Sequence, residues 1–159
     1  KDFPLKMAKL CKYADVILPN ISEAAFMTGM PYPGENASNE CIKDLLLSLA
    51  KLGSKIIVIT GVESADQKFG FMGYDSETKE FFEYYTSKVQ MKSHGTGDVF
   101  ASTFTGALMN DYNIQDSLKI AADFTKACIN NTYNDPEAVN YAVNFESEIP
   151  YLLKLIRKV

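Results

Sequence analysis

The sequence has few of the residues that build metal clusters and disulfide frameworks. Its 159 residues include one histidine, three cysteines and no tryptophan. Cys11, Cys41 and Cys128 are widely spaced and form no C-x-x-C pair, so neither a zinc site nor a disulfide framework is expected. We predict that these thiols are reduced and mostly buried, because a free cysteine packs as a small apolar side chain.

Clustered positive charge and long apolar runs are also lacking. The formal net charge is −4, and the lysines and arginines are scattered, which argues against a surface that neutralises a nucleic-acid backbone. No apolar run approaches the ~20 residues that span a bilayer, and the first residues carry no signal-peptide pattern. We therefore expect a cytoplasmic protein with no nucleic-acid partner and no membrane partner.

Helical and strand patterns alternate along the chain, whose 47% apolar content is ordinary for a globular domain. Periodicity and turn signals predict helices at 5–13, 20–29, 39–52, from the glycine motif to about 108, 114–131 and 145–157. They predict strands at 15–19, 55–60, 69–74 and 79–85, the last two forming a hairpin. The pattern favours a single α/β domain over residues 1–159, with one sheet covered on both faces and an antiparallel edge.

The stretch from Ser93 to Ser102, S-H-G-T-G-D-V-F-A-S, is typical of a phosphate-binding turn that leads into a helix. Gly95 and Gly97 lack a Cβ atom, so their backbone can take positive φ and approach an anion closely. Free N–H groups at the helix start favour phosphate, and Asp98 beside them can accept a proton from a hydroxyl group. This combination suits phosphoryl transfer to an alcohol. The alternative is that Asp98 only caps the helix.

Asn20 and Glu23 follow directly on the strand at 15–19, and their spacing places both side chains on one face of the next helix. In a parallel α/β sheet the ligand crevice lies at the carboxyl ends of the strands, where Asn20, Thr60 and the Gly95 turn would emerge. A carboxylate and an amide at that edge suit a hydrated Mg²⁺ ion. The alternative is a helix cap, supplied by Asn20 or Ser22, followed by an acidic first turn.

Three segments, in this order, resemble the ribokinase-like superfamily, and most closely its vitamin B6 (pyridoxal/pyridoxine) kinases. Leu18–Glu23 matches a T-P-N-x-x-E segment with leucine in place of threonine, Val58–Gly61 matches a V-T-G turn at a strand end, and Gly95–Phe100 matches G-T-G-D-x-F. The similarity covers essentially the whole chain. It implies a ribokinase-like three-layer α/β/α sheet, mostly parallel, with an antiparallel hairpin.

The resemblance implies ATP-dependent phosphorylation of the hydroxymethyl group of pyridoxal or pyridoxine, as in vitamin B6 salvage. Asp98 would be the base that deprotonates the substrate hydroxyl. The amides of Gly95, Thr96 and Gly97 would form the anion hole for the transferring phosphoryl group. ATP as co-substrate, Mg²⁺ and a homodimer of the full-length protein are also implied, and a need for a monovalent cation is left open.

The resemblance assigns the remaining site residues to the nucleotide and its metal ion. Asn20 and Glu23 would organise Mg²⁺ and the ATP phosphates, directly or through water. Four further residues would line the nucleotide: Thr60 and Gly61 at its phosphates, and Val89 and Met91 at its adenine.

The acceptor is less sharply defined than the nucleotide side. His-Gly-Thr-Gly also occurs in the related hydroxymethylpyrimidine phosphate kinases, in which a cysteine usually stands at the position of Asp98, so aspartate favours the vitamin B6 kinases. The alternatives are a kinase of another small alcohol, such as hydroxymethylpyrimidine or a sugar, and a non-catalytic nucleotide-binding module. The retained Asp98 argues against the module. His94 either packs and hydrogen-bonds within its loop or contacts phosphate.

Kinases of this family are nearly twice as long, and the chain begins with Lys1 rather than methionine. We expect it to be the carboxyl-terminal, nucleotide-binding part, without the half that carries most contacts to the pyridoxal ring. The isolated chain is then expected to bind Mg·ATP at most weakly and to lack kinase activity, because the acceptor hydroxyl cannot be held in line.

Overall fold

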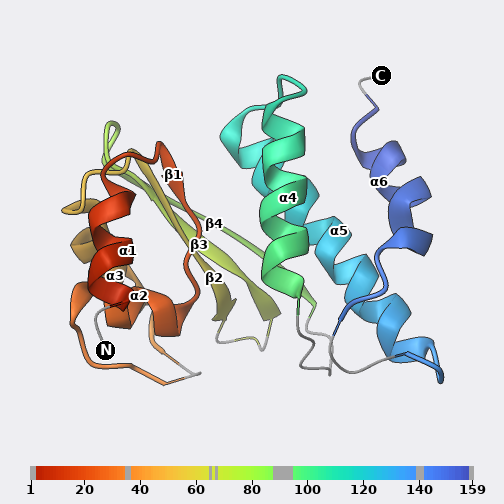
Figure 1. Ribbon diagram of the computed structural model, residues 1–159, viewed down its shortest axis with the longest axis horizontal. Helices are drawn as coiled ribbons and strands as arrows, with labels where there is room; N and C mark the ends of the chain where they lie inside the picture. The colour runs from red at the N-terminus through yellow and green to blue at the C-terminus, as the bar shows by residue number, and fades with distance from the viewer. Residues whose placement is uncertain are drawn as a thin grey trace. The chain divides into compact units, whose positions relative to one another are not determined.

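The computed structural model describes residues 3–34, 37–64, 66, 68–87, 95–138 and 142–157. They belong to two compact units, Lys1–Ser87 and Lys88–Val159 (Figure 1). Each unit is built from elements close in sequence, and each is described by itself.

The first unit contains one sheet of four strands in the order β1-β2-β3-β4. The strands are β1 (Val16–Ile17), β2 (Ile56–Glu63), β3 (Lys68–Asp75) and β4 (Glu80–Ser87). β1 and β2 pair in parallel, whereas β2–β3 and β3–β4 pair antiparallel, which confirms the predicted α/β fold with its hairpin. The parallel share among these described strands is smaller than expected, because only β1 and β2 are joined by a helical crossover.

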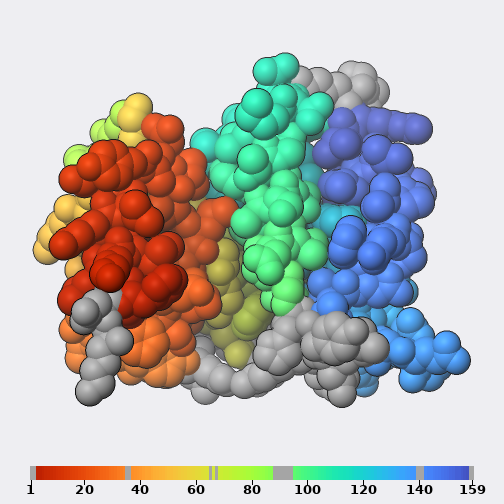
Figure 2. Space-filling model, in the orientation of Figure 1, coloured from red at the N-terminus to blue at the C-terminus, as the bar shows by residue number. Residues whose placement is uncertain are grey.

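The helices of this unit are α1 (Phe3–Cys11), α2 (Ile21–Thr28) and α3 (Asn39–Ala50). α3 contacts β2 and β3, and its buried side chains join sheet residues in one apolar cluster that includes Leu45, Leu49, Ile57 and Met72. α1 packs on α2 and forms part of the outer surface of the unit (Figure 2).

The burial of the cysteines was predicted correctly for Cys11 and Cys128, which are both buried. The prediction is wrong for Cys41, which is exposed. The apolar stripe of α3 runs from Ile42 through Leu45 and Leu46 to Leu49 at helical spacing, so Cys41 lies beside the stripe and not in it.

The second unit is helical in its described residues. α4 (Thr96–Leu108) packs on α5 (Ile114–Asn134), and a 3₁₀ turn, η1 (Glu146–Glu148), leads into α6 (Ile149–Leu155). Thr132 ties the segment before η1 to α5, because its hydroxyl donates to the Cys128 carbonyl (2.7 Å) and accepts from the Asn144 N–H (2.8 Å). None of the helices described here is long and apolar enough to cross a membrane.

Candidate active site

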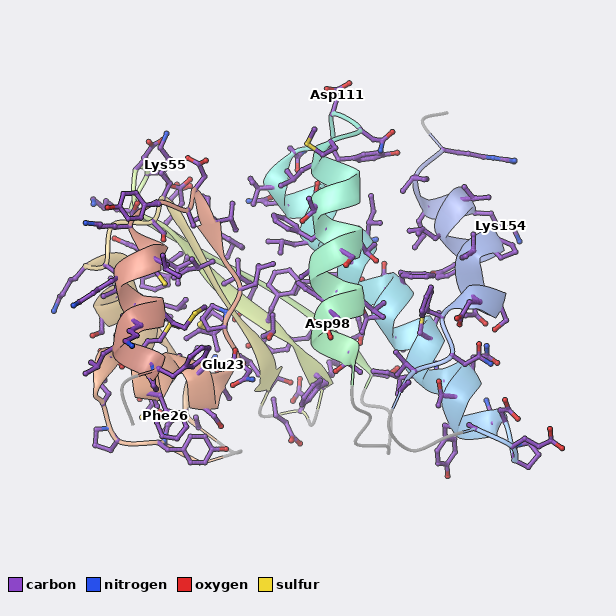
Figure 3. The ribbon with its side chains drawn as sticks, viewed as in Figure 1. Glu23, Phe26, Lys55, Asp98, Asp111 and Lys154 are labelled. Atoms are coloured by element: carbon purple, nitrogen blue, oxygen red, sulfur yellow. The ribbon has the colours of Figure 1, made fainter. Side chains whose placement is uncertain are left out.

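Asp98 lies in the first turn of α4, and it is not the helix cap. The N-cap is Gly95, in the left-handed conformation (φ 82°), and its carbonyl accepts the Val99 N–H at 3.2 Å. Asp98 is the third helical residue, its side chain is exposed, and no side chain caps the helix. The interpretation of Asp98 as a simple cap is therefore wrong. Figure 3 shows Asp98 at the amino-terminal end of α4.

The two glycines of this motif serve the backbone differently. Either glycine could adopt positive φ, and the structure shows it at Gly95 alone of the two, because Gly97 lies within the helix. A Cβ atom at either position would meet no neighbouring atom within 4 Å. The first N–H groups of a helix have no partner within it, so this end offers N–H donors that no described side chain caps.

The Asp98 carboxylate forms no hydrogen bond or ion pair within the described part of the chain. This helix end combines two chemical functions. The carboxylate can accept a proton from a hydroxyl group that reaches it, and the helix N–H groups can stabilise negative charge that develops nearby.

Asn20 and Glu23 form a reciprocal capping box at the start of α2. The Asn20 N–H donates to Glu23 Oε2 at 2.9 Å, and the Glu23 N–H donates to Asn20 Oδ1 at 2.9 Å. The helix-cap alternative is thus confirmed, with Asn20 as the cap. The box uses one carboxylate oxygen of Glu23, so the other oxygen can still bind a ligand.

The oxygen donors of this pair fit a water-rich magnesium site. Both residues are exposed, and the capping box uses Oε2 of Glu23 and not Oε1. Mg²⁺ prefers oxygen ligands and keeps several waters, so one carboxylate and one amide are sufficient protein donors. No group of three or more His, Cys, Asp or Glu side chains is placed to hold a metal ion among the residues described.

Thr60 lies next to Asn20, as predicted from the parallel arrangement. The two residues form a parallel bridge, and the Thr60 N–H donates to the Pro19 carbonyl at 2.9 Å. β1 therefore ends and α2 begins at the carboxyl end of the β1–β2 pair. The Gly95 turn belongs to the second unit, so its predicted meeting with this edge stays a prediction.

β2 does not end at Thr60, which corrects the predicted strand boundary. It continues to Glu63, and a bulge interrupts its pairing with β3 between Thr60 and Val62. Gly61 is the extra residue and has a φ of 74°. The structure shows the effect of the bulge: Ile57 and Ile59 lie in the apolar cluster, and the next residue of β2 in that cluster is Val62 rather than residue 61.

The remaining residues singled out in the sequence are Thr96, Val89, Met91 and His94. Thr96 is the first residue of α4 and is half-buried. Val89, Met91 and His94 lie outside the described residues.

Comparison with known proteins places these features in a family. The family described as phosphomethylpyrimidine kinase matches residues 4–143. A hydroxymethylpyrimidine/phosphomethylpyrimidine kinase of Haemophilus influenzae is 29% identical over 130 residues, covering 79% of this chain and 46% of the relative. A pyridoxine kinase of Bacillus subtilis is 27% identical, covering 79% of this chain and 45% of the relative. The chain thus spans about half the length of the curated relatives it matches.

The solved structure of pyridoxal kinase from Lactobacillus plantarum shares the fold. Its TM-score is 0.82 at 27% identity, over 97% of this chain and 54% of that one. The resemblance to the vitamin B6 kinases found in the sequence is thereby confirmed. The match over most of the chain shows that it belongs to the phosphomethylpyrimidine kinase family, in the ribokinase-like superfamily.

Proposed function

We propose that the protein is an ATP-dependent kinase that phosphorylates the hydroxymethyl group of pyridoxal or pyridoxine. The observation that carries this proposal is the position of Asp98 in the first turn of α4. Its carboxylate neither caps the helix nor pairs with another described residue, and it lies beside uncapped N–H groups. A carboxylate with no structural partner at such an end is suited to proton transfer.

In the proposed reaction Asp98 accepts the proton of the acceptor hydroxyl. The oxygen then attacks the γ-phosphorus of ATP, the bond to the β-phosphate oxygen breaks, and ADP leaves with that electron pair. The N–H groups of Gly95, Thr96 and Gly97 stabilise the charge on the transferring phosphoryl group. Preorganised backbone donors suit this task, because they need no reorganisation when the charge develops.

Asn20 and Glu23 would hold the nucleotide's metal ion, directly or through water. Mg²⁺, when bound, neutralises charge on the ATP phosphates. The capping box fixes the orientation of the Glu23 carboxylate, since Oε2 is held by the Asn20 N–H. Thr60 and Gly61 would line the phosphates at the same edge, and Val89 and Met91 the adenine.

The acceptor proposal depends on one residue. Asp98 occupies a position where hydroxymethylpyrimidine phosphate kinases usually carry cysteine, and two relatives of this chain are named pyridoxine kinase and pyridoxal kinase. Hydroxymethylpyrimidine is the second candidate, because a relative at 29% identity is named for it. Assays with pyridoxal, pyridoxine and hydroxymethylpyrimidine in parallel distinguish the two: a higher kcat/KM for the pyrimidine would reject the proposed acceptor.

The test of the base is Asp98→Asn in the protein as its gene encodes it. Turnover should fall by roughly 10²–10⁴, the usual contribution of a positioned base, with little change in ATP affinity. Asp116→Asn is the matched control, because Asp116 is the acidic residue at the same position of α5. It removes the same charge from a helix start and should leave turnover unchanged. A loss below about tenfold for Asp98→Asn would reject the base assignment.

A further inference from the structure

We infer that Gly61 is a positioning residue: its left-handed conformation builds the bulge that keeps Thr60 paired with Asn20, and so holds the Asn20–Glu23 capping box in place. This inference rests on the proposed function only where catalysis is measured. The geometry itself concerns the β1–β2 edge of the first unit.

The bulge allows both Thr60 and Val62 of β2 to keep their pairing partners. Thr60 pairs with Phe71 on one side and with Asn20 on the other. Val62 pairs with Gly70 and is 1% exposed in the apolar cluster. With regular alternation, the face that holds Ile57 and Ile59 would next receive residue 61. The extra residue returns Val62 to that face while Thr60 keeps its place.

Gly61 is required for its backbone angle and not for lack of space. Its φ of 74° lies in a region that side chains with a Cβ rarely adopt. A Cβ at this position would meet only the Cζ atom of Phe69 at 3.8 Å, which is an ordinary contact. Asparagine adopts the left-handed region more readily than other non-glycine residues, whereas alanine does not.

A residue that avoids positive φ at position 61 must displace Thr60 or Val62, and the contacts of these two residues predict which of them moves. Val62 is held by packing in the core, and burial of an aliphatic side chain resists its removal. The opposite neighbour is the bridge to Asn20, where Thr60 is half-buried, Asn20 is exposed, and one hydrogen bond joins the Thr60 N–H to the Pro19 carbonyl. Thr60 should therefore move more than Val62, and its pairing with Asn20, the first residue of the capping box, should weaken.

The first readout is amide hydrogen exchange in Gly61→Ala and Gly61→Asn, which needs no kinase activity. In Gly61→Ala the amides of Thr60, Asn20 and Glu23 should lose protection relative to the amides that pair β3 with β4. Gly61→Asn should restore most of it. Gly34→Ala is the control, because Gly34 also has positive φ (89°) and an open Cβ position but lies in the loop before α3. It should leave those three amides unchanged.

The second readout is kinetic. Gly61→Ala should lower kcat/KM for ATP by on the order of tenfold to hundredfold, as expected for small misplacement of site groups. If Gly61→Asn restores no amide protection at Asn20 and Glu23, the left-handed angle of Gly61 is not what holds them and the inference fails. If protection at Asn20 and Glu23 is unchanged in Gly61→Ala, the bulge positions nothing. Absence of kinase activity in the full-length protein rejects the proposed function alone, since the exchange experiment still decides the inference.

Discussion

Asn20 and Thr60, forty residues apart in sequence, face each other across the parallel pair of the sheet. The bridge lies where β1 gives way to α2, so the helix that carries Glu23 starts directly from the strand pairing. The orientation of the Glu23 carboxylate is therefore set by backbone hydrogen bonds and not by a flexible loop.

This arrangement predicts the effect of Glu23→Gln. The Gln side-chain oxygen can still accept the Asn20 N–H, so α2 should remain capped, but one negative oxygen donor is lost. The Mg²⁺ concentration for half-maximal rate should rise by roughly tenfold or more. Glu40→Gln, which removes the first-turn charge of α3, is the control and should not change it. An unchanged Mg²⁺ dependence in Glu23→Gln would limit Glu23 to capping.

The order and type of the elements could be predicted because apolar periodicity reflects burial within each segment. Asn20 as a cap also follows from local chemistry, since the box closes within four residues. The bulge at Gly61 could not be assigned from β2 alone, because it appears only in the register with β3. The role of Asp98 was ambiguous for a similar reason. Whether it is the cap or an acid of the first turn depends on where the helix begins, and the helix begins after Gly95, which has positive φ.

We predict that a buried hydrogen bond of Ser54 stabilises the fold at the end of β2 that lies away from Thr60. It is 1% exposed, and its hydroxyl donates to the Cys11 carbonyl at 2.7 Å, joining the end of α1 to the start of β2. Ser54→Ala should lower the free energy of unfolding by about 0.5–1.5 kcal/mol, because it removes one buried hydrogen bond while the Cys11 carbonyl keeps the Ala14 N–H as a partner. Denaturant titration should show a lower midpoint with an unchanged slope. Ser102→Ala, on an exposed face of α4, should stay within about 0.5 kcal/mol of the unmodified protein.

The cysteines are predicted to differ sharply in reactivity. Burial raises the pKa of the Cys11 thiol, and burial together with the Glu148 charge raises the pKa of Cys128 to about 12. The thiolate is the reactive form, so iodoacetamide at pH 8 should modify exposed Cys41 first in the folded protein. Peptide mass analysis should find Cys11 and Cys128 labelled only after denaturation. Equal labelling of Cys128 and Cys41 in the folded state would contradict the burial of Cys128.

Gly70 and Gly73 of β3 lie so close to β4 that we predict alanine at either position to destabilise the hairpin, by different amounts. A Cβ at Gly70 would lie 1.9 Å from the Tyr84 carbonyl oxygen, and one at Gly73 would lie 2.2 Å from the Phe82 ring. A ring can turn aside, whereas a paired strand backbone cannot move without losing its ladder. Gly70→Ala should therefore destabilise more than Gly73→Ala, for which overpacking predicts about 1–3 kcal/mol.

The matched control for this series is Gly106→Ala in α4, where a Cβ meets nothing within 4 Å. Alanine is the better helix former, so this variant should gain roughly 0.5–1 kcal/mol. Thermal unfolding of the three variants should rank them Gly106→Ala, Gly73→Ala, Gly70→Ala from most to least stable.

Removing the ring with Gly73→Ala/Phe82→Leu should recover part of the Gly73→Ala loss, because the crowding atom is then gone. A Gly70→Ala protein as stable as the unmodified one would show that β4 does not approach β3 as closely as Gly70 and Tyr84 indicate.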